Sequence, residues 1–319
     1  DVELVKQGAT WRIVRPVEQR AESNAVESLV KSLHDYDYTK VVAESRERWA
    51  EFGVQDAQHS ISLTYGDGKD DIVTVLVGNK APVGYSAYLR TTQSDKVYIG
   101  SQHILMAVAK TLFDFRDKTV ATVEERSLKS IVYKRDGQAP IELARVDGKW
   151  RIEKPTALEA DDAEIKDLID EVSQVRAAAF VDVPDKALVH GLTHPAIELQ
   201  WTNDKGEATS FRIAGHEGKF YAAFDPTKLA FQMPDEFYAK VEKDLTALRN
   251  RRVLHMDSLD LTQVDVDGES YKNVGGNWYK AAEAAKADKK EVNHLRALVV
   301  DLEFARTDRF FALDSAEAK

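Results

Sequence analysis

The chain repeats one pattern that begins with tryptophan. Residues 11–16 read WRIVRP and residues 150–155 read WRIEKP, a shift of 150 − 11 = 139, and Trp278-Tyr279-Lys280 opens a third, shorter copy. This spacing exceeds the roughly 20–50 residue periods of solenoids and propellers. We therefore expect each copy to be a supersecondary module or a small domain in its own right.

Each copy continues with the apolar stripe of an amphipathic helix, in which apolar residues recur at i, i+3, i+4 and i+7 in the first two copies and at i, i+3, i+7 and i+10 in the third. The stripes are Val26, Leu29, Val30 and Leu33, then Ile165, Leu168, Ile169 and Val172, and in the third copy Val292, Leu295, Val299 and Leu302. Asp161 with Glu164, and Asp288 with Glu291, resemble capping boxes ahead of the second and third helices.

The first two copies share a further half. Alternating apolar residues predict strands at 61–65 and 197–201, with partner strands at 72–77 and 209–214 that Gly78 and Gly215 close. A second helix follows at 104–115 and at 237–248, and each ends in cations, where the helix dipole is negative. Asp147-Gly148 and Asp267-Gly268 predict hairpin turns.

Hairpins interrupted by two helices, without βαβ alternation, predict an α+β fold. We expect tandem repeated modules, each an antiparallel sheet built from hairpins with two helices packed on one face. The predicted modules are residues 1–127, residues 128–260 and a partial third repeat at 261–319. Val2-Glu3-Leu4 matches Ile141-Glu142-Leu143, so residue 1 is expected to lie within a strand and the chain to begin after a removed segment.

These motifs are similar to those of the domain-of-unknown-function family 4340. The resemblance rests on the Trp-x-Ile-x-x-Pro hairpin, Phe-Gly-Val at 52–54 and His-Gly-Leu at 190–192, the Val-Gly turn, the Tyr-x-x-Tyr strand at 85–88 and Phe-Arg-Asp-Lys at 115–118. It implies an extracytoplasmic protein, membrane-anchored at full length, that is auxiliary to gliding-motility-type ABC transporters. It brings no catalytic residues with it.

Composition narrows the range of partners. Lys and Arg number 44 against 54 Asp and Glu, a net charge of −10, which disfavours nucleic acid and anionic membrane surfaces. The Arg249-Asn250-Arg251-Arg252 cluster is the counter-argument, and we interpret it as a solvated helix end. The absence of cysteine excludes disulfides and thiolate chemistry and fits a periplasmic protein, although many cytoplasmic proteins also lack it.

The candidate chemical sites have simpler structural explanations. His190 and His194 stand four apart, but the glycine and proline around them predict a turn, and no third ligand is evident. The acidic stretch at 67–71 is too short for a calcium loop and lacks its distal glutamate. Glu124-Glu125 and Asp161-Asp162 are adjacent pairs, which do not face each other on a helix.

Neither phosphate-binding glycine motifs nor a nucleophile elbow occurs in the sequence. The sequence therefore predicts no catalytic, cofactor-binding or metal-ligating residue and no cofactor. Aromatic residues on the strands form either a binding platform or part of the sheet–helix core, and their repetition in both copies favours the core. They are Tyr85, Tyr88, Tyr98, Trp201, Phe220, Tyr221 and Phe224.

Three functions remain open. The first is a non-enzymatic scaffold that binds a transporter permease or envelope complex, with a possible homo-oligomer formed through the partial third repeat. The second is a small-molecule or lipid binder that uses a groove between modules. The third, a hydrolase with no recognisable motif, is the least favoured.

Overall fold

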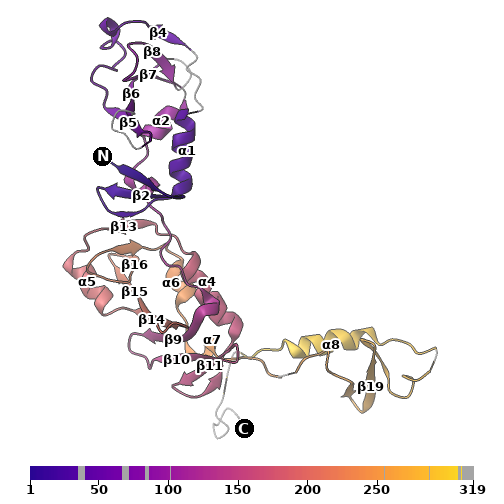
Figure 1. Cartoon of the computed structure of the whole chain (residues 1–319). Coiled ribbons are helices and arrows are strands. Elements are labelled where there is room, and N and C mark those ends of the chain that lie inside the picture. The colour runs from indigo at the N-terminus through magenta and orange to yellow at the C-terminus, as the bar shows by residue number, and fades with distance from the viewer. Residues whose placement is uncertain are drawn as a thin grey trace. The chain divides into compact units, whose positions relative to one another are not determined.

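A computed structural model describes residues 1–34, 40–66, 72–82, 86–100, 102–254, 256–286, 288–307 and 310. The chain folds into two compact units, residues 1–118 and residues 119–319. Both are mixed α+β, and the strands pair antiparallel throughout the described residues (Figure 1). The predicted module boundaries, 127/128 and 260/261, stay predictions.

Unit 1 contains two separate sheets and three helices. A three-stranded sheet has the order β1-β2-β3, and a five-stranded sheet has the order β4-β8-β7-β6-β5. The strands are β1 Glu3–Gln7, β2 Thr10–Arg15, β3 Gln19–Arg20, β4 Val41–Ala43, β5 His59–Thr64, β6 Ile72–Lys80, β7 Ala87–Thr91 and β8 Val97–Gly100. The helices are α1 Ser23–His34, α2 Gln102–Val108 and α3 Leu112–Phe115. One apolar core joins both sheets to these helices.

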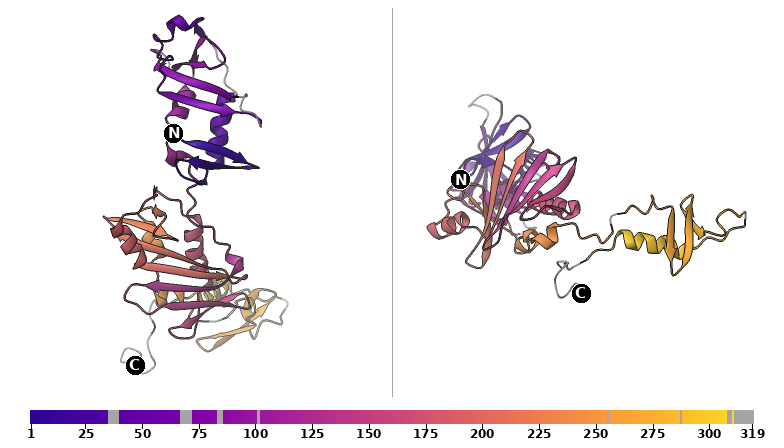
Figure 2. Two further views of the ribbon diagram at one scale, coloured as in Figure 1. Left: turned by 60° about the vertical axis from the view of Figure 1, so that its left-hand side comes forward. Right: turned by 90° about the horizontal axis from the view of Figure 1, so that it is seen from below.

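Unit 2 is built on one nine-stranded sheet of order β12-β11-β10-β9-β14-β15-β16-β17-β13. Its strands are β9 Leu128–Arg135, β10 Ile141–Val146, β11 Lys149–Lys154, β12 Leu158–Glu159, β13 Ala179–Val181, β14 Ile197–Asn203, β15 Ala208–His216, β16 Lys219–Ala223 and β17 Ala230–Gln232. Its helices are α4 Asp162–Gln174, α5 Lys186–Thr193, α6 Phe237–Val241 and α7 Leu245–Leu248. Figure 2 shows the sheet from two further sides.

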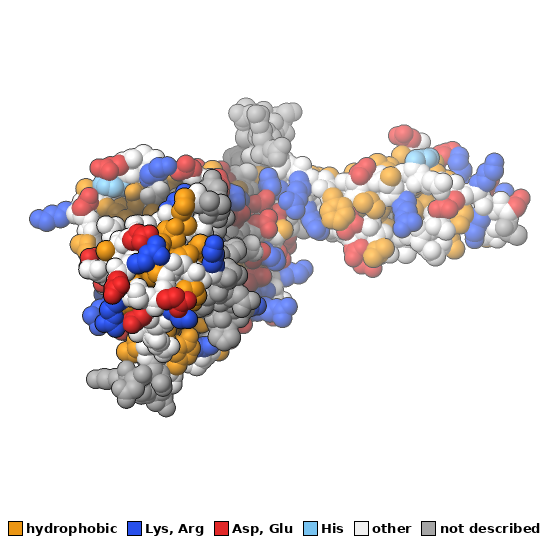
Figure 3. Space-filling model, turned by 90° about the horizontal axis from the view of Figure 1, so that it is seen from above, with side chains coloured by type: hydrophobic (Ala, Val, Ile, Leu, Met, Phe, Trp, Pro, Cys, Tyr) orange, Lys and Arg blue, Asp and Glu red, His pale blue; other side chains and the backbone are white. Residues whose placement is uncertain are grey.

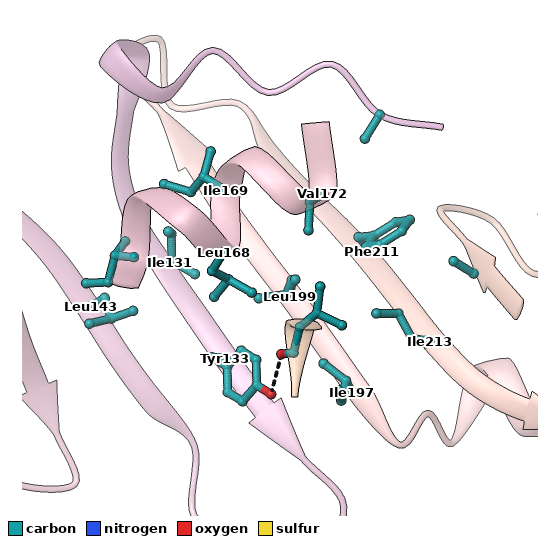
Figure 4. Packing of buried hydrophobic residues seen from close by; sticks show 14 of the residues in the cluster. Ile131, Tyr133, Leu143, Leu168, Ile169, Val172, Ile197, Leu199, Phe211 and Ile213 are labelled. Atoms are coloured by element: carbon teal, nitrogen blue, oxygen red, sulfur yellow. Dashed lines mark hydrogen bonds between the residues drawn. The ribbon is translucent and has the colours of Figure 1, made fainter. Parts of the chain in front are cut away.

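The main core of unit 2 lies between the sheet and α4. Leu168 and Val172 of α4 point toward the side chains of the sheet, among them Leu199 of β14, as Figure 4 shows, and Ile169 belongs to the same core. Side chains that are buried there lose almost all contact with water, and each contributes roughly 1.5–3 kcal/mol to folding. The apolar stripe that predicted this helix is therefore the one that fixes it to the sheet.

The remainder of unit 2 includes a third hairpin and helix. We call residues 256–286 and 288–307 the third segment. It holds β18 Gln263–Val266, β19 Glu269–Val274 and β20 Asn277–Lys280, paired in the order β18-β19-β20, followed by α8 Asn293–Glu303. Tyr271 and Trp278 of the hairpin bury against Leu295 and Val299 of α8.

The tryptophan-led hairpins share one backbone pairing. In β1–β2 Leu4 faces Ile13 and Lys6 faces Trp11, in β10–β11 Leu143 faces Ile152 and Arg145 faces Trp150, and in β19–β20 Asn273 faces Trp278. A bulge falls between Glu3 and Leu4 and again between Glu142 and Leu143. The hairpin turns predicted at 147–148 and 267–268 are confirmed, since the aspartate and the glycine of both have positive φ.

Two predicted strand ends are wrong. β6 and β15 run through Gly78 and Gly215 instead of stopping there. Gly78 is required for packing, because a Cβ on it would lie 2.3 Å from the carbonyl oxygen of Phe52. β15 turns two residues after Gly215, at Glu217-Gly218, where both residues have positive φ.

The second helix of each copy, predicted as one element, is two. The first pair is α2 and α3, and the second is α6 and α7. Thr111 and Asp114 form a capping box that starts α3, and the Asp244 carboxylate accepts from the amide of Ala247 to start α7. Each new cap ends the preceding helical run.

The structure adds a helix that the sequence did not predict, because α5 packs on the face of the unit 2 sheet opposite to α4. Leu188 and Leu192 of α5 contact Ala214 of β15, whereas the neighbouring Ile213 belongs to the core under α4. Successive strand residues point to opposite faces. Gly191 lies inside α5, which also corrects the turn predicted around it.

The predicted start of α8 needs correction as well. Asp288 and Glu291 form no capping box, because α8 begins at Asn293 after Val292, without a side-chain cap. The amide of Val292 donates to the carbonyl of Trp278 at 2.8 Å, which holds residue 292 against β20. At the start of α4, by contrast, Asp161 does cap, accepting from the amides of Ala163 and Glu164.

Candidate protein-interaction surface

The helix α8 corresponds in position to α4. After each of the two helices, one backbone carbonyl accepts a hydrogen bond from the segment that follows the preceding copy in the sequence. The Val120 amide donates to the carbonyl of Val175 at 3.5 Å, and the Val253 amide donates to that of Ala305 at 2.9 Å. This aligns residue 175 with residue 305, and hence α4 with α8 at a shift of 305 − 175 = 130.

The aligned helices bury half of their stripe alike and half differently. Ile165 and Ile169 of α4 are buried, as are their counterparts Leu295 and Val299 of α8. Leu168 and Val172 are 1% and 2% exposed, whereas their counterparts Leu298 and Leu302 are 37% and 38% exposed. Two of the four α8 residues that align with the buried stripe of α4 are therefore exposed.

The difference accompanies two changes: among the described residues no strand pairs with the outer edge of β18, and no counterpart of α6 and α7 packs on α8 as these helices pack on α4. In unit 2, β9 pairs with β10 on one edge and with β14 on the other, and Leu168 and Val172 pack toward Leu199 and Trp201 of β14. β18 takes the place of β9 in its hairpin, but among the described residues it pairs with β19 alone.

We call the outer edge of β18 together with Leu298 and Leu302 the open face. It combines unpaired backbone N–H and C=O groups with apolar side chains, the combination to which an added strand binds. Val300 and, just after the helix, Phe304 are 38% and 57% exposed, but each lies two residues from Leu302 and therefore on another side of α8. Apolar side chains of the third segment show at the surface between acidic and basic ones in Figure 3.

The charges of the hairpin are used to hold its strands together. Lys280 of β20 lies 2.7 Å from Glu269 of β19, and the Tyr271 hydroxyl donates to the same carboxylate. These two hydrogen bonds hold the pKa of Glu269 below its usual value. Asp265 of β18 accepts from Ser270 of β19. These polar side chains pair with one another within the hairpin. None of these pairs involves the backbone groups on the outer edge of β18.

The two histidines that were weighed as ligands lie at the end of α5. His190 is helical and His194 is its C-cap, with ring centroids 4.5 Å apart. The Nδ1 atom of His194 lies 3.2 Å from the carbonyl oxygen of His190. Within the described residues no three His, Cys, Asp or Glu side chains are grouped as a metal site would need. The acidic stretch at 67–71 lies outside the described residues.

The acidic pair Asp161-Asp162 and its neighbour Glu164 bind other parts of unit 2. Asp162 accepts from the amide of Trp150 at 2.8 Å, and Asp161 lies 3.3 Å from Arg306 as well as capping α4. Glu164 contacts Lys243 at 3.2 Å and Arg251 at 3.1 Å. Asp161 therefore takes part in fixing the C-terminal residues to α4.

Of the other predicted acidic pair, Glu125 lies in a 3₁₀ turn, Glu125–Ser127, 3.7 Å from Arg145. It joins β10 to the segment before β9.

One cluster of charged side chains was not singled out from the sequence. Glu198 of β14 accepts from Ser210 at 2.7 Å and lies 3.0 Å from Lys134 and 3.1 Å from Arg212. Burial raises its pKa, but hydrogen bonds from Ser210 and Lys134 outweigh this and hold the pKa below its usual value. In the sequence, the alternation of side chains along β14 was the only signal that could have placed Glu198 next to residues of β9 and β15.

The arginine cluster after α7 is half-buried, so its description as a solvated helix end is wrong. Arg249 packs over the ring of Phe310 at 3.4 Å, and Arg251 pairs with Glu164. The aromatic residues follow the favoured interpretation: Trp201 and Phe224 pack with Phe211, and Phe220 stacks on Tyr238 at 4.2 Å. Tyr85 lies outside the described residues.

An apolar cavity of about 20 Å³ lies between β14 and α4. This volume accepts about one water molecule. Among the described residues, no helix combines the length and the apolar character that crossing a membrane requires.

The sequence of the whole chain agrees with one known family. The family described as "Domain of unknown function (DUF4340)" matches residues 11–195 and, in a second overlapping match, residues 150–318. The chain belongs to the DUF4340 family. Each match begins at or next to a tryptophan-led strand, at Trp11 and at Trp150, so the DUF4340 pattern recurs with the hairpin. No curated protein and no solved structure matches the chain significantly.

Proposed function

We propose that this DUF4340 protein is a non-enzymatic scaffold that binds other proteins through the open face of its third segment. The observation that carries the proposal is the contrast between α4 and α8: side chains that are buried under β14 in unit 2 are more than a third exposed in the third segment. An apolar helix face beside an unpaired strand edge is a common site of protein association.

The finer architecture belongs to the same proposal. We infer tandem modules, two full and one partial, at residues 1–127, 128–260 and 261–319. The shared hairpin register, the shared bulge and the shared contact after the first helix support this organisation. The partial module has the hairpin and helix but, in its described residues, no sheet half beyond them.

The partner that fits the open face offers one extended strand with apolar side chains on the side facing α8. That is what β14 offers to β9, with Leu199 and Trp201 facing α4. Resemblance to the family supports an extracytoplasmic, membrane-tethered setting and a permease or envelope protein as the partner. A second copy of this chain is the alternative occupant, and the test separates the two.

A double variant tests the proposal. Leu298→Asp with Leu302→Asp places two charges on the open face without touching the buried residues of α8. Its matched control is Val183→Asp. Val183 is 88% exposed and lies far from the open face in the sequence. Two properties are measured for both variants. The first is capture, by the purified chain, of the membrane permease whose gene neighbours that of this chain. The second is the mass of the chain by sedimentation.

The double variant should lose permease capture while the control keeps it. Equal capture by the double variant and the control would contradict the proposed site. A dimer that the double variant alone converts to a monomer would instead assign the open face to a second copy.

A further inference from the structure

The two sheets of unit 1 have β1 and β5 as edge strands. In unit 2 a single strand, β9, lies between the counterparts of these two strands and joins them into one sheet. Within the described part of unit 1, β1 pairs with β2 alone and β5 pairs with β6 alone. In unit 2 the corresponding strands β10 and β14 both pair with β9, which makes one continuous sheet.

The correspondence rests on register and sequence. β1–β2 and β10–β11 have the same pairing and the same bulge at a shift of 139 (150 − 11). β5 matches β14 because Ile61, Leu63 and Tyr65 alternate as Ile197, Leu199 and Trp201 do. Both sheets of unit 1 face a single core, in which Leu4 and Ile13 of the hairpin join Ile61 and Leu63 of β5.

Burial shows what the absent strand would cover. Leu143, Ile197 and Leu199, which flank β9, are 1%, 0% and 3% exposed. Their counterparts Leu4, Ile61 and Leu63 are only partly buried, and Tyr65 is 47% exposed. The same side chains are therefore less covered in unit 1, and they lie along the two open edges.

We propose that the edges of β1 and β5 take up one strand of the β9 pattern, supplied by the stretch of the natural chain that leads directly into residue 1. In unit 2 residues 136–140 join β9 to β10, and by the constant shift Asp1 occupies the place of Pro140. A strand in this place is therefore continuous with β1 through a loop of the same length. The two open edges call for this strand, whatever the first residue of the sequence is.

The register of unit 2 specifies the side chains of the strand. Tyr133 of β9 faces Ile141 and Leu199, and Ile131 faces Leu143 and Trp201. The strand in unit 1 therefore carries large apolar residues at the two positions that face Val2 with Leu63 and Leu4 with Tyr65. The position between them points to the other face of the sheet, as Val132 does in β9.

The test joins a copy of residues 128–139 directly ahead of Asp1 in the full chain, so that the loop keeps its length. Amide hydrogen exchange of β1 and β5 is compared with that of the chain without the addition. The outward amides of both strands should slow by at least about tenfold, because they gain partners in a closed sheet. The control addition carries Ile131→Asp and Tyr133→Asp in the added copy and should give no protection.

A second arm uses the natural residues that precede residue 1 in place of the added copy, and protection by them supports the proposal. Unchanged exchange of both β1 and β5 with either addition would overturn it. Protection by the copy of β9 but not by the natural residues would also overturn it, since the strand would then come from another protein.

Discussion

Tyr133 shows how one side chain joins sequence-distant parts of unit 2. Its hydroxyl donates to the carbonyl of Val241 at 3.0 Å and accepts from the amide of Lys243 at 2.8 Å (Figure 4). The ring is 1% exposed in the centre of the core. Tyr133 therefore fixes β9 to the end of α6, so that the sheet and the helices form one structure.

Tyr133→Phe should destabilise unit 2 by about 1–3 kcal/mol. The substitution keeps the ring but leaves the amide of Lys243 and the carbonyl of Val241 without their partner in a buried place. Denaturant unfolding of the variant and the parent chain measures the difference. A change below a few tenths of a kcal/mol would mean that water replaces the hydroxyl.

The same residue predicts a loss of stability at high pH. Burial raises the pKa of Tyr133 from its usual value near 10 to about 12. Below pH 10 the hydroxyl is protonated in both states and its contribution is fully present. As the pH rises from 10 to 12 the unfolded chain releases the proton first, which removes roughly 2–3 kcal/mol of stability.

Unfolding free energies at pH 9, 10, 11 and 12 check this prediction, with the Tyr133→Phe chain as the control for the other groups that titrate there. The parent chain should lose stability more steeply over this interval than the variant. Parallel slopes for the two chains would contradict the assigned pKa.

Glycine residues were the least predictable from sequence. Gly78 and Gly215 both follow apolar strands and both were interpreted as strand ends, yet each lies inside a longer strand. The reason for Gly78 is a close approach to the backbone of Phe52, which only the folded structure reveals.

Gly78→Ala should therefore be costly and Gly215→Ala mild. The new methyl group at residue 78 would lie 2.3 Å from a backbone oxygen, whereas at residue 215 its nearest neighbour is a ring carbon of Phe220 at 3.8 Å. We expect a loss of about 1–3 kcal/mol in the first variant and under about 1 kcal/mol in the second, by thermal or denaturant unfolding. Similar losses in both variants would contradict the close contact.

At the scale of elements, the sequence predicted the hairpins and the first helix of each copy because apolar alternation and capping act locally. Asp161 and the stripe from Ile165 to Val172 are examples. It missed α5, since the helix is short and Gly191 interrupts its pattern, while the burial of Leu188 and Leu192 depends on Ala214 of a distant strand. It also joined α2 to α3, because their apolar spacing continues across the new cap at Thr111.

The counterparts Leu168 and Leu298 test the open face without any partner. Leu168→Ala should destabilise unit 2 by about 2–5 kcal/mol, because the side chain is 1% exposed and its removal leaves a cavity. Leu298→Ala should cost less than about 1 kcal/mol, because more than a third of the side chain is in water. Chemical denaturation compares the two variants, and equal losses would mean that residue 298 is covered in solution.

At the scale of the whole molecule, the repeat in the sequence predicted that one hairpin pattern would recur. The register that the tryptophan-led hairpins share agrees with this prediction. The open face could not be predicted from the apolar residues of α8 alone. Leu298 and Leu302 align with two buried residues of α4, and the elements packed beside the helix, a strand and two short helices in the case of α4, decide whether such residues are covered. The proposed function therefore depends on what the third copy lacks in its described residues.

Amide hydrogen exchange of residues 263–266, in the chain alone and in complex with a captured partner, tests the central claim most directly. The account predicts that the outward amides of β18 exchange rapidly in the free chain and slow by at least about tenfold in the complex, together with a loss of solvent exposure at Leu298 and Leu302. Exchange that is equally slow in both states, or unchanged by the partner, would contradict it.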